Sequence, residues 1–230
     1  MSLQGRLLGA PIAHRGLWRA AARPENSLAA FEAACAGGYG IELDVRLTAD
    51  GEAVVFHDDA LDRLTAESGL MEERTLAELN AIVLLGGDGQ HIPSLQEALG
   101  VIGARALVLV ELKTPAGQEG PLEALVAELL LAHPGPAGVL SFNAGALGWM
   151  ADHAPGLARG LNADAAAAFE TMDVARPYFL SVGLELAAHP RLQDWRNNGR
   201  AAIAWTVRKP ADWDRFAALA DNLVFEGFAP

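Results

Sequence analysis

Short apolar segments alternate with helical patterns along most of this 230-residue chain. Segments such as residues 40–47, 106–110 and 138–142 are rich in aliphatic residues and have the length of buried strands, whereas residues 121–132 form a longer, amphipathic pattern. A parallel strand reaches its neighbour through a crossover connection that is usually a helix. The alternation therefore predicts an α/β domain built on a parallel sheet.

The number of strands limits the architecture further. Seven or eight strands with crossover helices in one domain favour a single (β/α)8 TIM-type barrel. A small insertion is expected after the second or third strand, where a polar stretch runs from Asp58 to about Glu73. A doubly wound open sheet is the alternative. The expected strands end at His14 or cover residues 40–47, 53–57, 106–112, 138–142, 157–161, 179–184, 201–207 and 222–226, and the expected helices include 27–36, 75–83, 94–102, 121–132 and 144–153.

Length and composition agree with one soluble domain that covers residues 1–230. No low-complexity linker divides the chain, and no uninterrupted apolar run is long enough to span a bilayer, although 51% of the residues are hydrophobic. The net charge of −12 argues against nucleic acid as a partner, because binding to a phosphate backbone needs basic patches. A single cysteine, Cys35, and the lack of a signal-peptide pattern favour the cytoplasm, without stable membrane insertion. The oligomeric state is left unknown.

Histidines and charged residues stand where four of the apolar segments end. In a barrel the carboxyl ends of the strands carry the active site, so these side chains are expected to converge there. No glycine-rich motif of the kind that cradles nucleotide phosphates follows any strand, which gives nucleotide cofactors no support. The residues at the strand ends are His14 and Arg15, Glu42 and Asp44, His57, and Glu111 and Lys113.

The spacing of the acidic residues indicates what such a site could hold. Residues i and i+2 of a strand point to the same face, so Glu42 and Asp44 project together, and Glu111 and Lys113 form a second such pair. Two acids directed inward repel each other and are costly to desolvate unless a cation or a donor compensates. A divalent metal would compensate, but for a lone Glu-x-Asp pair structural ion pairs at a barrel rim are the more common explanation. Histidines and Glu111 at equivalent strand ends favour the metal.

Many of these residues belong to short motifs that are weak singly but specific as an ordered set. They are His14-Arg15-Gly16, Pro24-Glu25-Asn26-Ser27, Glu42-Leu43-Asp44, Thr48-Ala49-Asp50-Gly51, His57-Asp58, Leu61-Asp62-Arg63 with Thr65, Ile92-Pro93-Ser94-Leu95, Glu111-Leu112-Lys113, Ser141-Phe142 and Trp205-Thr206-Val207. Over most of the chain this set resembles the glycerophosphodiester phosphodiesterase family. The resemblance implies a TIM-type barrel that hydrolyses a small-molecule glycerophosphodiester to glycerol 3-phosphate and an alcohol, with bound Mg²⁺ or Ca²⁺.

The resemblance also implies a role for each polar residue of the site. Carboxylates suit Mg²⁺ or Ca²⁺, an arginine and a lysine suit a phosphate, and two histidines suit general acid–base catalysis. Which histidine is the base, and whether water or the neighbouring glycerol hydroxyl attacks, is left open. The implied metal ligands are Glu42, Asp44 and Glu111, the catalytic residues are His14, His57 and Arg15, and the substrate-binding residues are Lys113, Trp205 and Asn26.

Several positions allow a second interpretation. Asn26 is equally suited to cap the helix after it, Trp205 to fill the barrel core, and Asp58 to orient His57 or cap a loop. The family usually has Thr-Asp where this chain has Phe225-Glu226, and Asn where it has Arg208, so the headgroup preference is left open. A final helix after the last strand is not expected. Two other functions are kept: a lysophospholipase D-type phosphodiesterase, and a non-catalytic barrel that binds phosphodiesters, although binding alone would not need the histidine pair.

Overall fold

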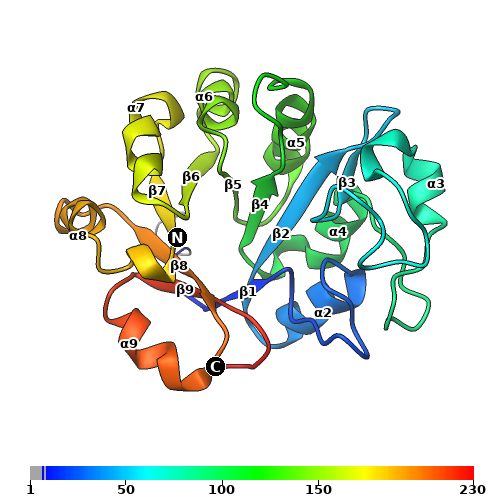
Figure 1. Ribbon diagram of the computed structural model, residues 1–230, viewed down its shortest axis with the longest axis horizontal. Coiled ribbons are helices and arrows are strands. Elements are labelled where there is room, and N and C mark those ends of the chain that lie inside the picture. Colours follow the sequence, from blue (N-terminus) through cyan, green and yellow to red (C-terminus); the bar gives the residue numbers. More distant parts are fainter. Residues whose placement is uncertain (1–6, 8) are drawn as a thin grey trace.

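Eight parallel strands close into a barrel, with a ninth strand outside the ring (Figure 1). The computed structural model describes Leu7 and residues 9–230. In this part of the chain the sheet runs in the order β1-β9-β8-β7-β6-β5-β4-β2-β3, and the pairing of β1 with β2 closes it. The predicted (β/α)8 barrel is confirmed, and the open sheet is wrong. The strands are β1 (Ile12–His14), β2 (Gly40–Leu47), β3 (Ala53–Val55), β4 (Val108–Leu112), β5 (Ala137–Ser141), β6 (Ala158–Ala163), β7 (Phe179–Gly183), β8 (Ala202–Val207) and β9 (Asn222–Phe225).

The strand outside the ring, β3, is antiparallel to β2 and determines where His57 lies. We expected His57 at the end of a barrel strand, but it follows this returning strand by two residues. The hairpin brings it back beside β2, where Phe56 N donates to Asp44 O at 3.1 Å. The expected insertion therefore lies between β2 and β4, and it begins with β3.

Helices surround the strands (Figure 1), and several of them begin at a polar side chain. Thr75 and Ser94 each start a helix with a capping box, and Ser27 caps α2 by accepting from Ala30 N. Asn26 is therefore not the cap of α2. No helix in the described residues is long and apolar enough to cross a bilayer. The helices are α2 (Leu28–Ala36), α3 (Leu76–Asn80), α4 (Leu95–Ile102), α5 (Pro121–Ala132), α6 (Ala144–His153), α7 (Met172–Ala175), α8 (Pro190–Asn197) and α9 (Trp213–Ala217), with short 3₁₀ turns η1 (Met71–Glu73), η2 (Gly103–Arg105), η3 (Ala166–Thr171), η4 (Leu184–Leu186) and η5 (Pro210–Asp212).

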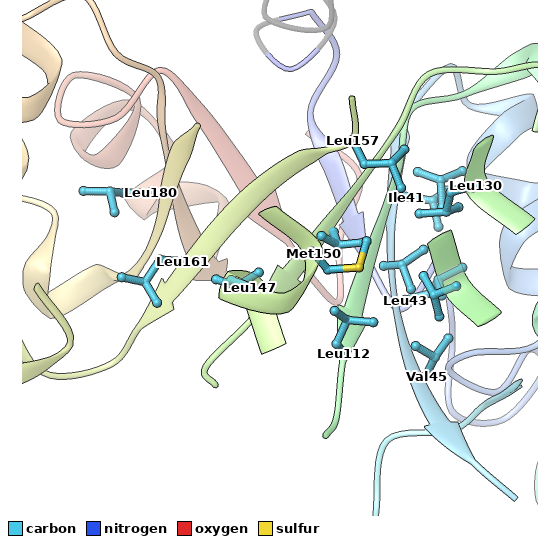
Figure 2. Packing of buried hydrophobic residues seen from close by; sticks show 14 of the residues in the cluster. Ile41, Leu43, Val45, Leu112, Leu130, Leu147, Met150, Leu157, Leu161 and Leu180 are labelled. Atoms are coloured by element: carbon cyan, nitrogen blue, oxygen red, sulfur yellow. The ribbon is translucent and has the colours of Figure 1, made fainter. Parts of the chain in front are cut away.

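Alternate residues of the barrel strands pack beneath the helices and form the larger apolar core. Ile41, Leu43 and Val45 of β2 are fully buried there, in one cluster with Leu130 of α5 and Met150 of α6. Figure 2 shows the three β2 side chains in a row along their strand. Burying each such side chain stabilises the fold by about 1.5–3 kcal/mol. This core fixes which side chains of β2 point outward, so Glu42 and Asp44, which alternate with them, must point into the barrel.

The residues that point into the barrel change from apolar to polar along four of the strands, β1, β4, β7 and β9. A separate interior cluster includes Ile12, Leu109, Phe179 and Val224. Because side chains on one face of a strand recur every second residue, the next inward position lies closer to the carboxyl end. Two residues further along these four strands, or just beyond them, stand His14, Glu111, Ser181 and Glu226.

Gly160→Ala tests how tightly the interior is packed. A Cβ at Gly160 would lie 2.3 Å from Phe179 and 2.5 Å from Leu140, both buried in the interior cluster. Overpacking a closed core costs about 1–3 kcal/mol, so the free energy of unfolding in urea should fall by that amount. Gly156→Ala is the matched control, since a Cβ there meets nothing within 4 Å. Equal stabilities of the two variants would contradict the close packing.

Candidate active site

A cavity of about 370 Å³ opens where the predicted site residues meet. Seven of the nine predicted residues line it, and the two that do not are Asp44 and Asn26. The strand-end residues are therefore brought together as expected. The polar and aromatic lining residues are His14, Arg15, Glu42, His57, Glu111, Lys113, Phe142, Asn162, Ser181, Glu185, Trp205, Thr206 and Arg208.

Three carboxylates form the buried centre of the site. Glu42 and Asp44 come from β2, and Glu111 comes from the adjacent β4, in register with Asp44. One oxygen from each of the three lies within 4.8 Å of the others. All three side chains are buried, and Asp44 is 0% exposed. Because Mg²⁺ and Ca²⁺ prefer oxygen ligands, this donor set is chemically suited to either ion.

Two cationic side chains neutralise part of this negative charge. Lys113 Nζ lies 3.0 Å from Asp44 Oδ1 and also contacts Glu111. Arg15 Nε lies 3.2 Å from Asp44 Oδ2, and another nitrogen of Arg15 lies 2.6 Å from Glu25 Oε1. Burial would raise the pKa of Asp44, but Lys113 and Arg15 outweigh burial and hold that pKa well below its usual value. Asp44 is therefore ionised between its two cations.

The other two acids of the cluster are less well compensated. Burial raises the pKa of Glu42 well above its usual value, and the charges of Asp44 and Glu111 add to the effect. Burial and the charge of Asp44 likewise raise the pKa of Glu111. Glu42 Oε2 accepts from Arg15 N at 3.1 Å, but within the described residues no donor reaches Glu42 Oε1. A buried carboxylate oxygen that has no donor and lies beside two other acids is costly, and a bound cation would stabilise it.

His57 lies at the cavity in contact with a carboxylate and, through it, an arginine. Its Nδ1 is 2.7 Å from Asp58 Oδ1, and Arg63 donates to both oxygens of Asp58 at 2.6 and 2.9 Å. The hydrogen bonds from Arg63 lower the pKa of Asp58 to about 2, with burial opposing and His57 assisting. Burial lowers the pKa of His57. Of the two interpretations of Asp58, the contact with His57 is the one that the structure shows.

His14 has the same kind of surroundings, contributed by the opposite end of the sequence. Its Nδ1 is 2.6 Å from Glu226 Oε2, and Arg208 Nε donates to Glu226 Oε1 at 3.1 Å. Burial would raise the pKa of Glu226, but the hydrogen bonds and charges of His14 and Arg208 outweigh burial and lower it to about 2. Sequence reasoning identified Glu226 and Arg208 only as departures from a pattern, and the structure places them against each other.

Asn26 contacts the carboxylate cluster without lining the cavity. Its Nδ2 donates to Asp44 Oδ2 at 2.9 Å, and its side chain is almost fully buried. Its φ of 57° lies in the left-handed region, which asparagine tolerates better than most residues. A role of Asn26 in substrate binding stays a prediction.

Asn162 and Ser181 line the cavity and were missed by the sequence analysis. They are register partners on β6 and β7, and Asn162 Nδ2 donates to Glu111 Oε2 at 3.1 Å. Among the described residues, Asn162 Oδ1, Ser181 Oγ and Trp205 Nε1 are buried without a hydrogen-bond partner. The available signal was one polar residue at an inward position of an apolar strand, which can be read only once the facing of the strand is known.

Comparisons with known proteins agree with this geometry. The model of the glycerophosphoryl diester phosphodiesterase family matches residues 14–222. A glycerophosphodiester phosphodiesterase of Caldanaerobacter subterraneus is 32% identical over 222 residues, which cover 89% of this chain and 88% of that protein. A probable glycerophosphodiester phosphodiesterase 1 of Mycobacterium tuberculosis is 32% identical over 230 residues, covering 88% and 83%. The chain therefore belongs to this family, and it is an enzyme of the phosphoric diester hydrolase class.

A solved structure supports the same assignment. The phosphodiesterase of Oleispira antarctica, in complex with its product sn-glycerol-3-phosphate, superposes with a TM-score of 0.86 at 30% identity. The similarity covers 98% of this chain and 95% of that protein. The family resemblance inferred from the motifs is confirmed.

Glu42→Gln should stabilise the protein when divalent metal is removed by chelation. The change removes a buried carboxyl group whose pKa is raised by burial and by the charges of Asp44 and Glu111. The amide oxygen of glutamine can still accept the hydrogen bond from Arg15 N. We expect a gain on the order of 1–3 kcal/mol in urea unfolding at neutral pH. A raised carboxyl pKa penalises the ionised form, so the gain should shrink as pH falls and vanish below the unfolded-state pKa of about 4.3.

Glu128→Gln, at an exposed position of α5, is the control for that experiment. It should change stability by less than about 0.5 kcal/mol. A loss of stability in Glu42→Gln at neutral pH would show that the cluster carries no excess negative charge.

Proposed function

We propose that this protein hydrolyses glycerophosphodiesters to glycerol 3-phosphate and an alcohol, using a divalent cation and two histidines. The main support is one cavity that both histidines, Arg15, Lys113 and two acids of the carboxylate cluster line together. Cleaving a phosphodiester requires stabilisation of negative charge, a proton acceptor and a proton donor, and this set of side chains offers all three. We further propose that residues 1–230 form one barrel domain.

Glu42, Asp44 and Glu111 would hold the cation, which we take to be Mg²⁺ or Ca²⁺. The unpartnered Glu42 Oε1 and the proximity of the three carboxylates fit such an ion. When bound, the cation supplies charge that polarises a nonbridging phosphate oxygen. Asn26 and Asn162 donate to Asp44 and Glu111, which orients these ligands.

Arg15 and Lys113 would bind the phosphate. Both line the cavity, and although burial opposes it, the neighbouring acids raise the pKa of each side chain, so both stay charged. Arg15 offers a planar fork of donors, and Lys113 offers a compact charge. Arg15 has a φ of 56°, and Gly16 follows it with a φ of 80°. This turn directs the chain away from β1 just after His14.

His14 and His57 would transfer the protons. Each ring has a carboxylate at Nδ1, which leaves Nε2 as the nitrogen available to substrate. One histidine would accept a proton from the attacking oxygen, which is water or the neighbouring glycerol hydroxyl. The other would donate a proton to the oxygen of the departing alcohol.

Asn162, Ser181 and Trp205 would recognise the glycerol hydroxyls. Their unpartnered atoms comprise an amide oxygen that accepts, a hydroxyl that donates or accepts, and an indole N–H that donates. Two neighbouring hydroxyls of glycerol can complement such a set. The Trp205 ring also contacts Phe142 edge-on at a centroid distance of 5.8 Å, which supplies an apolar wall for the carbon chain.

Activity should require a divalent cation. Chelation should abolish turnover of glycerophosphocholine, and Mg²⁺ or Ca²⁺ should restore it. Because a charged ligand is lost, Asp44→Asn should weaken metal binding in calorimetry by at least about tenfold. Full turnover in excess chelator, with no metal found by elemental analysis, would overturn the metal assignment.

His14→Ala and His57→Ala should each lower kcat by about 10²-fold or more, which is the usual scale of general acid–base assistance. Because the two residues act in one step, the double variant should be far less than multiplicatively worse. His153→Ala, at the exposed end of α6, is the control and should leave kcat unchanged. Near-normal kcat in either active-site variant would remove that histidine from the mechanism.

Choline and ethanolamine esters of glycerophosphate should be cleaved with kcat/KM values within about tenfold of each other, because the polar groups address the glycerol and the phosphate. Ser181→Ala should lower these values about fivefold, or ~1 kcal/mol for one hydrogen bond. Bis(p-nitrophenyl) phosphate should be a poor substrate that Ser181→Ala does not affect. Faster cleavage of this diester than of glycerophosphocholine would indicate a general phosphodiesterase, and faster cleavage of lysophosphatidylcholine would indicate a lysophospholipase D-type enzyme.

A further inference from the structure

Glu226 lies where it can set the hydrogen-bonding state of His14. It directly follows β9, and the parallel pairing of β9 with β1, with Ala13 opposite Phe225, places it beside His14. Its Oε2 is 2.6 Å from His14 Nδ1. A carboxylate can only accept hydrogen bonds, so the neutral ring of His14 carries its proton on Nδ1, and Nε2 keeps its lone pair. Nε2 is the nitrogen on the side of the acidic cluster, 3.9 Å from Glu42 Oε2.

Arg208 in turn holds the carboxylate of Glu226. Its Nε and a terminal nitrogen donate to the two oxygens of Glu226 at 3.1 and 3.4 Å. Glu226 N also donates to Val207 O at 3.0 Å, so backbone and side chain both attach Glu226 to the end of β8. The Arg208 side chain is 61% exposed, and such an ion pair adds little to stability. Its effect is to fix the orientation of the carboxylate.

The same three-part arrangement occurs a second time at this cavity. His57 Nδ1 meets Asp58, and Asp58 is held by Arg63. These residues follow β3, outside the barrel ring, so the pairing of β1 with β9 cannot explain the repetition. What the two arrangements share is a histidine that lines the cavity.

We infer that Glu226 is a positioning residue for His14, which fixes the orientation and the Nδ1–H tautomer of the ring, and that Arg208 holds Glu226 in place. The inference rests on the proposed role of His14 in proton transfer. A carboxylate that orients a histidine in this way leaves Nε2 ready to exchange a proton with substrate, without itself touching substrate.

The tautomer of His14 can be measured without metal or substrate. In ¹⁵N-labelled protein comprising residues 1–230, kept in chelator at a pH where the ring is neutral, long-range ¹H–¹⁵N spectra distinguish the two tautomers, and His14→Ala assigns the signals. We expect Nδ1–H in the wild type and in Glu226→Asp. Glu226→Gln can donate to Nδ1 and should increase the Nε2–H form. An Nε2–H ring in the wild type would overturn the inference, whatever the activity.

Kinetics give the second measurement. Glu226→Gln should lower kcat for glycerophosphocholine by at least about tenfold while KM changes less than about twofold, and Glu226→Asp should retain most of kcat. Arg208→Asn should also lower kcat, but by a smaller factor than Glu226→Gln does. The control is Glu170→Gln, which removes an exposed carboxylate 2.6 Å from Arg191 and should leave kcat and KM unchanged.

The outcomes separate this inference from the proposed function. Unchanged kcat in Glu226→Gln, or a raised KM with normal kcat, would reduce Glu226 to a structural or substrate-binding residue and overturn the inference. Thermal melting establishes that each variant is folded, and Glu226→Asp serves as the conservative variant if Glu226→Gln is not. A wild-type protein that cleaves no glycerophosphodiester would refute the proposed function, while the ring spectra would still decide the inference.

Discussion

Excess negative charge at the carboxyl end of the barrel is the constraint on which the rest of the site depends. Three carboxylates on two adjacent strands are buried within 4.8 Å of one another. Like charges at this spacing are stable only if neighbouring groups supply positive charge or donate hydrogen bonds to them. Arg15 and Lys113 supply charge, and Asn26 and Asn162 supply N–H groups. The two cations are the most exposed of these donors, which is why we propose that they also bind the anionic phosphate.

Two features of the backbone concentrate these groups in one place. Every second residue of a barrel strand faces the outer core, where apolar side chains such as Leu43 are fully buried. Glu42 and Asp44 occupy the alternate positions of β2 and therefore point inward. Closure of the ring then joins residues that are far apart in sequence. His14 and Glu226 are 212 residues apart and meet because β1 pairs with β9. The site is thus assembled by the barrel as a whole and not by any single motif.

The sequence predicted those parts of the site that depend on local patterns. The Glu42-x-Asp44 and Glu111-x-Lys113 pairs could be recognised because i and i+2 residues share a face of a strand. The position of His57 could not be predicted, because an apolar segment does not reveal whether its strand joins the ring or folds back against β2. Ser181 went unnoticed for a related reason, since a single polar residue in an apolar strand has no meaning until the register places it at the cavity.

The two histidines obtain their carboxylates in different ways, and this explains why one could be read from the sequence and the other could not. Asp58 is adjacent to His57 in the chain, so the pair is a local motif. The partner of His14, Glu226, directly follows β9, and the partner of Glu226, Arg208, directly follows β8. Residues in contact change each other's energetic effect when substituted. Phe225-Glu226 and Arg208 looked like two independent departures from the family pattern, but Glu226 and Arg208 form one contact that keeps a carboxylate at His14 Nδ1.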